Sequence, residues 1–188
     1  RGLWRPGANL KALNAEPFFD LIIEPGDLAA VADSGATARR PARRIAPVSV
    51  LDVLEPLDRV HAAEALGLDP ARPTALITLG SGASGRGDDL VAAAVEVLRA
   101  DSAGWQIATT QAALHDGGDA PEQVHVLRGV YPLAEFVGAF DLVVTASGYN
   151  AVHEFVAAGL PTILVPNAET ATDDQVARAE QLVRDGLA

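Results

Sequence analysis

Five short apolar runs between residues 74 and 165 limit the possible folds of this chain more than any other feature. They cover residues 74–79, 105–109, 124–127, 141–145 and 162–165, with helix-length or loop-length spacers between them. Their β-branched and apolar content is typical of buried parallel strands. Strands and helices that alternate in this way predict an α/β fold with a doubly wound, Rossmann-like parallel sheet.

The block 141–182 is the most informative part of this pattern. It reads DLVVTASGYNAVHEFVAAGLPTILVP, then a polar loop, then DDQVARAEQL. The order predicts a strand, a Ser-Gly turn, a helix that stops at Gly159, a second strand and another helix. Polar residues follow both strands, and an open α/β sheet binds ligands at the carboxyl ends of its strands. We therefore expect the binding site there.

The turn at Ser147 and Gly148 is expected to begin a helix, with Ser147 as its cap. The amino end of that helix would present N–H groups and the positive end of a dipole to a diphosphate. Glu154 follows Ser147 by about two helical turns, so it would project from nearly the same face. Its carboxylate could accept hydrogen bonds from paired hydroxyls such as those of a ribose. The alternative is an ordinary exposed helix residue. His153 would point about a quarter-turn away and is expected to be packed or solvated rather than catalytic.

Asp174 and Gln175 allow two interpretations. The sequence TDDQ fits a capping box, in which Thr172 and Gln175 would satisfy each other's backbone groups. An acid beside an amide is also a common way to bind sugar hydroxyls, and both residues would sit in the same crevice as Glu154.

A glycine-rich loop follows the first strand of the predicted sheet. Residues 80–85 read GSGASG, which fits the dinucleotide pattern G-x-G-x-x-G. That pattern also needs an acidic residue at the end of the second strand, where this chain has Thr109 and Thr110, so NAD binding is disfavoured. Small residues would still let the backbone approach a ligand closely, and a flexible surface loop is the other interpretation.

Charge and composition exclude several classes of function. The 188 residues carry a net charge of −11, which argues against a nucleic-acid partner. Without cysteine, and with four scattered histidines, the sequence predicts no metal site. No apolar run is long enough to span a bilayer and no signal peptide is evident, so a cytoplasmic location is the expectation.

The upstream third gives weaker signals. Residues 18–29 predict a buried strand closed by a Pro-Gly turn, residues 30–44 a linker, and residues 56–67 a short helix. Four arginines at positions 39, 40, 43 and 44 could hold a phosphate or an anionic membrane surface, although a solvated charge run explains them more simply. Because the chain opens at Arg1 and has no methionine, we expect a fragment of a longer protein.

The block 141–182 resembles the C-terminal donor domain of GT-B glycosyltransferases, above all glycosyltransferase family 28. The pattern S-G-x-x-x-x-x-E, G-x-P-x-x-x-x-P and a later glutamine matches residues 147, 148, 154, 159, 161, 166 and 175, whereas Arg178-Ala179 replaces the family's Asn-Ala. The related signature of plant and animal UDP-glycosyltransferases is matched at Gly148, Asn150, Glu154, Asp174 and Gln175. Ala146 stands where those enzymes have a phosphate-binding histidine, which favours binding of phosphate by the backbone. The resemblance covers about residues 74–188.

The resemblance implies a role for each part of the predicted site. Glu154 would hold the ribose, and Gly148 with Ser147, Tyr149 and Asn150 the diphosphate. Gln175 and Asp174 would bind the donor sugar, Gly80 and Ser81 would face the phosphates from the other side, and the backbone of Val130 would read the base.

The implied activity is metal-independent and cofactor-free transfer of a sugar from UDP or a related nucleoside diphosphate to an acceptor hydroxyl. The acceptor would be lipid-linked or a small molecule. Residues 1–44 would be a remnant of an acceptor domain with its linker, and residues 45–188 the donor domain. The catalytic base, and any peripheral contact with a membrane, would belong to the missing part, so the fragment alone would bind donor without turnover. The alternatives are a nucleotide-sugar hydrolase or epimerase of the same fold, or a non-catalytic nucleotide-binding module. The residues Glu169-Thr170-Ala171 lack the arginine of the epimerase signature.

Overall fold

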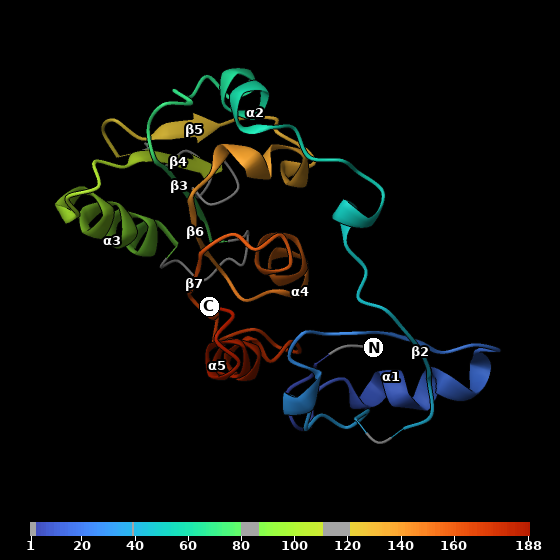
Figure 1. Cartoon of the computed structure of the whole chain (residues 1–188). Helices are drawn as coiled ribbons and strands as arrows, with labels where there is room; N and C mark the ends of the chain where they lie inside the picture. Colours follow the sequence, from blue (N-terminus) through green and yellow to red (C-terminus); the bar gives the residue numbers. More distant parts are fainter. Residues whose placement is uncertain (1–2, 39, 80–86, 111–120) are drawn as a thin grey trace.

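The computed structural model describes residues 3–38, 40–79, 87–110 and 121–188. Its main element is a five-stranded parallel sheet with the strand order β5-β4-β3-β6-β7 (Figure 1). The strands are β3 (Thr74–Thr78), β4 (Gln106–Thr110), β5 (His125–Leu127), β6 (Leu142–Thr145) and β7 (Thr162–Leu164). These are the five predicted strands, and the doubly wound fold class is confirmed.

The chain winds outward from β3 to β5, then returns to the other side of β3 and continues through β6 to β7. The direction of winding therefore reverses between β3 and β6, which pair with Leu76 opposite Val143. Such a reversal leaves a crevice outside the carboxyl ends of the two strands, because the connections on either side lead away from each other.

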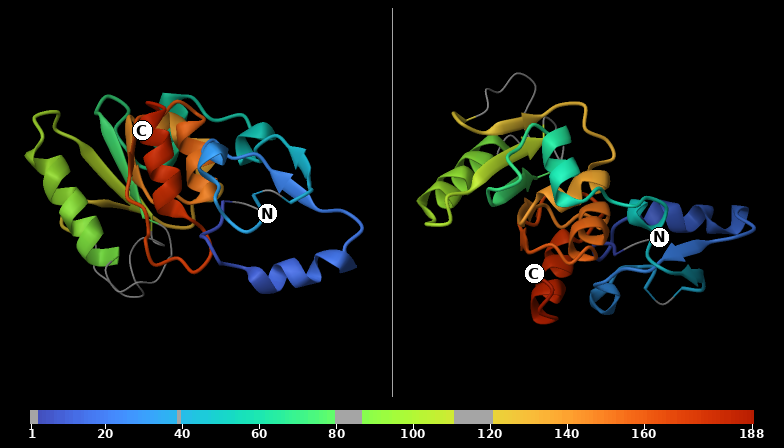
Figure 2. Two further views of the ribbon diagram at one scale, coloured as in Figure 1. Left: turned by 90° about the horizontal axis from the view of Figure 1, so that it is seen from below. Right: turned by 45° about the horizontal axis from the view of Figure 1, so that its top comes forward.

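Helices cover both faces of the sheet. They are α2 (Arg59–Ala65), α3 (Gly87–Ala100), η5 (Leu133–Ala139), α4 (Tyr149–Ala151), its continuation η6 (Val152–Val156) and α5 (Gln175–Arg184). Alternate residues of β3 face opposite layers, because side chains alternate along a strand. Leu76 packs in a cluster with residues of α2 and η6, while Ala75 and Ile77 pack with Val91 and Val95 of α3. The two layers appear on opposite sides of the sheet in Figure 2.

Asp141 anchors the opposite, amino end of the sheet. Its carboxylate accepts two hydrogen bonds from Arg59 of α2 (2.8 and 3.0 Å) and one from the N–H of Thr74 (2.8 Å). Burial alone would raise the pKa of Asp141, but the hydrogen bonds from Arg59 and Thr74 and the charge of Arg59 outweigh it and lower the pKa. The first residue of the block 141–182 is thus structural.

The N-terminal part forms a smaller unit beside α5 and α4. It contains α1 (Leu10–Ala15), η1 (Glu16–Phe18), β1 (Ile23–Pro25), η2 (Ala30–Ala32), β2 (Arg43–Ile45) and η3 (Val50–Asp52). The predicted buried strand over residues 18–29 is wrong. β1 is three residues long and pairs only with β2, and Phe18 is 86% exposed. Phe19, Leu21 and Ile23 are exposed as well, whereas the buried part of the run is Ala29 and, in part, Leu28, which lie after the Pro-Gly turn and not in a strand.

The segment 30–44 is more ordered than a linker. It holds η2 and most of β2, and two of its arginines pair with glutamates, Arg40 with Glu16 (2.8 Å) and Arg44 with Glu24 (3.1 Å). The proposed boundary between residues 44 and 45 falls within β2 and stays a prediction. Among the described helices, none combines the length and the apolar content needed to cross a bilayer.

Candidate functional site

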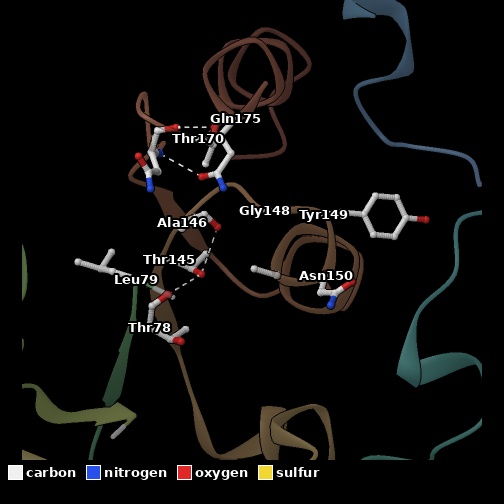
Figure 3. A pocket seen from close by; sticks show the side chains of 11 residues that line it. Thr78, Leu79, Thr145, Ala146, Gly148, Tyr149, Asn150, Thr170 and Gln175 are labelled. Atoms are coloured by element: carbon white, nitrogen blue, oxygen red, sulfur yellow. Dashed lines mark hydrogen bonds between the residues drawn. The ribbon is translucent and has the colours of Figure 1, made fainter. Parts of the chain in front are cut away.

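A hollow of about 390 Å³ lies at the carboxyl ends of β3 and β6, at the point where the winding reverses (Figure 3). Its lining comes from these two strand ends, the start of α4, the loop after β7 and the first residue of α5. The lining residues are Thr78, Leu79, Thr145, Ala146, Gly148, Tyr149, Asn150, Ala151, Asn167, Thr170 and Gln175. Four predicted site residues, Gly148, Tyr149, Asn150 and Gln175, are among them.

Threonines fix the floor of the hollow. The hydroxyl of Thr145 donates to the carbonyl of Thr78 (2.9 Å), and the hydroxyl of Thr110 donates to that of Thr78 (3.4 Å). These bonds tie the ends of three neighbouring strands together. Thr78 and Thr145 are not among the site residues predicted from the sequence, although their place at the ends of the first and fourth strands was an available signal.

The turn before α4 differs from its prediction. Gly148, not Ser147, is the N-cap residue, and it provides no side-chain cap. Ser147 is fully buried, and its hydroxyl donates to the carbonyl of Gln175 (2.7 Å). The hydroxyl of Ser147 therefore holds the turn against α5 and is used within the protein. The N–H groups at the start of the helix have no partner within the helix, as at every helix start.

The side of Gly148 on which other residues carry a Cβ atom faces the side-chain amide of Gln175. A Cβ atom built on Gly148 would lie 3.7 Å from Nε2 of Gln175, which is ordinary contact. Asn150 is exposed and lines the same hollow. The Tyr149 ring points away from it (Figure 3), and its hydroxyl donates to the carbonyl of Gly26 and accepts from the N–H of Val48, both at 2.9 Å. The phenol therefore joins the N-terminal unit to α4.

Glu154 lies one turn beyond Asn150 and Ala151 but is not among the lining residues. The helix changes there to a π turn, closed by a bond from the Ala157 N–H to the Val152 carbonyl (3.3 Å), so the predicted spacing of 3.6 residues per turn does not hold over η6. Glu154 is half-buried, and its carboxylate accepts no hydrogen bond within the described part of the chain. Burial raises the pKa of its carboxyl group.

His153 is packed, as the sequence predicts. It is 1% exposed and its ring stacks on Tyr149 at 4.1 Å. Nε2 accepts the N–H of Leu28 (3.1 Å) and Nδ1 lies 2.8 Å from the Tyr149 carbonyl. Since both ring nitrogens bond to backbone groups, His153 is not available as a base.

The predicted capping box at Thr172 is wrong. Asp174 is the N-cap of α5 and its carboxylate accepts the N–H of Ala177 (3.1 Å). Gln175 does not reach back. Its Oε1 accepts the N–H of Asn167 (3.0 Å), which directs the amide nitrogen toward Gly148. The side chain of Gln175 thus borders the hollow, while that of Asp174 holds the helix.

Val130, the remaining predicted residue that the structure describes, is not among the lining residues. Val130 follows β5 and packs against the core cluster that includes α2, and its neighbour Tyr131 is 88% exposed. Gly80 and Ser81 lie outside the described residues. Within the described ranges, no three His, Asp or Glu side chains converge as metal ligands.

Comparisons with known proteins indicate a family for this chain. Residues 103–188 match the model of the glycosyltransferase family 28 C-terminal domain. The chain is 30% identical, over 139 residues, to the UDP-N-acetylglucosamine–N-acetylmuramyl-(pentapeptide) pyrophosphoryl-undecaprenol N-acetylglucosamine transferase of Phocaeicola vulgatus. That match covers 70% of the chain and 37% of the relative. A protein of the same name from a Nocardioides species is 36% identical over 115 residues, which is 57% of the chain and 31% of the relative.

The chain thus spans about a third of the length of these curated relatives. Among solved structures, spinosyn forosaminyltransferase SpnP superposes with a TM-score of 0.56 at 18% identity, over 87% of this chain and 40% of that one. This likeness concerns the fold.

Proposed function

Because the chain belongs to glycosyltransferase family 28, whose C-terminal domain it carries at residues 103–188, we propose that it is the donor-binding part of a glycosyltransferase. The hollow between β3 and β6 would take a nucleoside diphosphate sugar. The relatives are named for transfer of N-acetylglucosamine from its UDP derivative, so UDP-N-acetylglucosamine is the first donor to test. Neither relative is named as a hydrolase or an epimerase.

The observation that supports this proposal most directly is the environment of the Glu154 carboxylate. A half-buried carboxylate that accepts no hydrogen bond from the described residues is unfavourable in its ionised form, which agrees with its raised pKa. Two neighbouring hydroxyls of a ribose would supply the missing donors, and hydrogen bonds to a charged acceptor are among the stronger ones. Glu154 follows Asn150, a lining residue of the hollow, by one helical turn, and it is not itself a lining residue.

The diphosphate would lie against the start of α4. The helix runs without a break through η6, from Tyr149 to Val156, and its first N–H groups and dipole favour a negative charge. The same groups would stabilise the charge that develops on the leaving nucleoside diphosphate, a role that preorganised N–H donors can fill without a metal. Gly80 and Ser81 remain predicted contacts from the opposite side.

The donor sugar would meet the side-chain amide of Gln175. Its Oε1 is already bonded to Asn167, so the Nε2 hydrogens are the groups left for a sugar hydroxyl. Asp174 could contribute only its second carboxylate oxygen, because the first caps α5. The nucleobase of the donor would lie toward Val130, whose backbone groups would form hydrogen bonds with it.

Transfer would be direct, from the donor to an acceptor hydroxyl. The names of the relatives include an undecaprenol-linked pyrophosphate, so a lipid-linked acceptor is the one we propose. The group that deprotonates the acceptor would come from the part of the longer relatives that this chain does not cover, and so would any contact with a membrane. A cytoplasmic location stays an expectation.

Calorimetric titration with UDP tests the proposal. We expect saturable binding by the wild-type chain and affinity weaker by about tenfold or more in Glu154→Ala, because two hydrogen bonds to a carboxylate are lost. Glu180→Ala is the matched control, since Glu180 is an exposed glutamate of α5 paired only with Arg184 at 3.5 Å. Equal affinity of the Glu154 and Glu180 variants would refute the assignment of the ribose site. Parallel titrations with GDP and TDP would identify the base.

A further inference from the structure

Arg178 stands out among the residues behind the donor hollow. It is 0% exposed and is the largest wholly buried side chain in the described part of the chain. A buried arginine is rare unless acidic or carbonyl oxygens surround it. It occupies the position at which the family pattern has asparagine, and it does not line the hollow.

The guanidinium of Arg178 joins three segments that are far apart in the sequence. It forms a two-pronged bond with the carboxylate of Asp173 (2.8 and 3.0 Å), and its Nε donates to Asp27 (3.0 Å). Nη1 also donates to the carbonyl of Ser147 (2.8 Å). Burial alone would lower the pKa of Arg178, but Asp173 and Asp27 outweigh it and raise the pKa, so the cation persists.

One of these bonds, together with a second bond to α5, fixes the turn that would face the diphosphate. The backbone of Ser147 is held by Arg178, and its hydroxyl is held by the carbonyl of Gln175 (2.7 Å). Arg178 and Gln175 are three residues apart on α5, so they lie on the same side of that helix. Gly148 directly follows Ser147 in the chain. The N–H groups of Gly148 and of the next residues therefore cannot shift relative to α5 without breaking both hydrogen bonds of Ser147.

The Asp173 bond fixes the loop that would face the sugar. The carbonyl of Asp173 accepts the hydroxyl of Thr170 (2.6 Å), and Thr170 lines the hollow. Residues of the N-terminal unit hold the same loop, since the N–H of Arg5 donates to the Thr172 carbonyl (2.8 Å) and the N–H of Asp174 donates to the Leu3 carbonyl (3.0 Å).

Asp27 connects this arrangement to the N-terminal unit. The side chain of Asp27 is 6% exposed. The residues on either side of Asp27 form hydrogen bonds with the continuous helix made by α4 and η6. The carbonyl of Gly26 accepts the Tyr149 hydroxyl, and the N–H of Leu28 donates to His153. Three consecutive residues therefore bind α4, η6 and α5 together from behind the hollow.

We propose that Arg178 is a positioning residue of the donor site, and that through its bond to Asp27 the N-terminal unit sets the geometry of the Ser147–Gly148 turn and of the loop 167–175. The inference rests on the proposed function for its ligand. The N-terminal unit thus acts on donor affinity without touching the donor.

The test compares Asp27→Asn with Asp33→Asn. Both carboxylates line a second hollow of about 210 Å³, but Asp33 accepts the N–H of Gly35 (2.9 Å) and has no bond to Arg178 among the described residues. We expect UDP affinity to fall about three- to tenfold in Asp27→Asn and to stay at the wild-type value in Asp33→Asn. Should Asp27→Asn fail to fold, Arg178→Lys serves instead. It keeps the charge but loses the planar fork that holds Asp173 and Ser147 together, so a similar loss is expected.

Hydrogen exchange of the unliganded chain separates this inference from the proposed function. In Asp27→Asn, or in Arg178→Lys in its place, we expect faster exchange in the peptides 145–150 and 167–175, whether or not UDP binds. If the wild-type chain does not bind UDP, the donor assignment fails while the exchange result still tests the positioning role. The positioning role is refuted if the variant has wild-type exchange in both peptides. It is also refuted if UDP binds the variant as tightly as the wild type while only the melting temperature falls.

Discussion

Gly148→Ala should separate ligand binding from folding at the start of α4. The backbone of Gly148 has φ −68° and ψ 157°, which any L-residue adopts. Among the described residues, a Cβ atom there would meet only Nε2 of Gln175, at 3.7 Å. Loss of glycine at an N-cap costs about 0.5–1 kcal/mol, and the stiffer unfolded chain offsets a similar amount. The melting temperature should therefore change by no more than about 3 °C.

The effect on binding should be much larger. The new methyl group would occupy the space in which a phosphate oxygen approaches the N–H groups of the turn. The loss of one hydrogen bond to a charged group amounts to about 1.5–3 kcal/mol, or roughly a 10- to 150-fold weaker affinity for UDP. Calorimetry gives the affinity and differential scanning fluorimetry the melting temperature.

Gly138→Ala is the matched control for a glycine that the fold itself requires. A Cβ atom at Gly138 would lie 2.5 Å from the carbonyl oxygen of Leu57, so the backbone must move and the melting temperature should fall clearly. The reasoning is refuted if Gly148→Ala binds UDP as tightly as the wild type. It is equally refuted if Gly148→Ala is destabilised as much as Gly138→Ala.

Three further predictions concern stability. Asp141→Asn should lower the free energy of unfolding by about 1–2 kcal/mol at pH 7, measured by urea denaturation, because Arg59 loses part of its two-pronged partner. The folded-state pKa of Asp141 is lowered, so its contribution is complete above the ordinary value of 3.8, and the difference from the wild type should shrink as the pH falls below it. A constant difference would exclude this ion pair as the cause. Glu154→Gln should raise the melting temperature of the unliganded chain at pH 7, because the raised pKa of Glu154 means that its ionised form destabilises the fold. The gain should vanish as the pH falls through that pKa, and a lower melting temperature at pH 7 would contradict it. Tyr149→Phe removes two hydrogen bonds to the N-terminal unit and should cost about 1–2 kcal/mol in the same denaturation assay, whereas an unchanged midpoint would show that water replaces them.

The sheet could be predicted because its signal is local and repeated. Each strand from β3 to β7 is a short apolar run bounded by turn residues, and burial on both faces makes such runs continuous. The strand order places the ends of β3 and β6 together, and Gly148, Asn150 and Gln175 line the hollow at that place. The strand-turn-helix pattern pointed to Gly148 and Gln175, whereas only the family resemblance pointed to Asn150.

The errors arose where a local pattern has more than one use. The sequence TDDQ fits the capping-box pattern. In the structure, however, Oε1 of Gln175 accepts the N–H of Asn167 from the preceding loop, and Asp174 is the N-cap of α5. Ser147 looks like a cap, yet a carbonyl of α5, 28 residues away, takes its hydrogen bond. The partners in both cases are set by tertiary structure, which propensity cannot express.

The upstream errors have a different cause. The run around Ile23 has the apolar content of a core strand, but burial depends on a covering layer that composition does not reveal. The burial of Arg178 was equally hidden, because Asp27, one of its two acidic partners, lies 151 residues away. An arginine on an amphipathic helix is normally assigned to solvent.

A crystal structure of the chain soaked with UDP would test the central claim most directly. We expect both ribose hydroxyls within hydrogen-bond distance of the Glu154 carboxylate, and the diphosphate against the N–H groups that follow Gly148. UDP bound elsewhere, or a ribose turned away from Glu154, would contradict it.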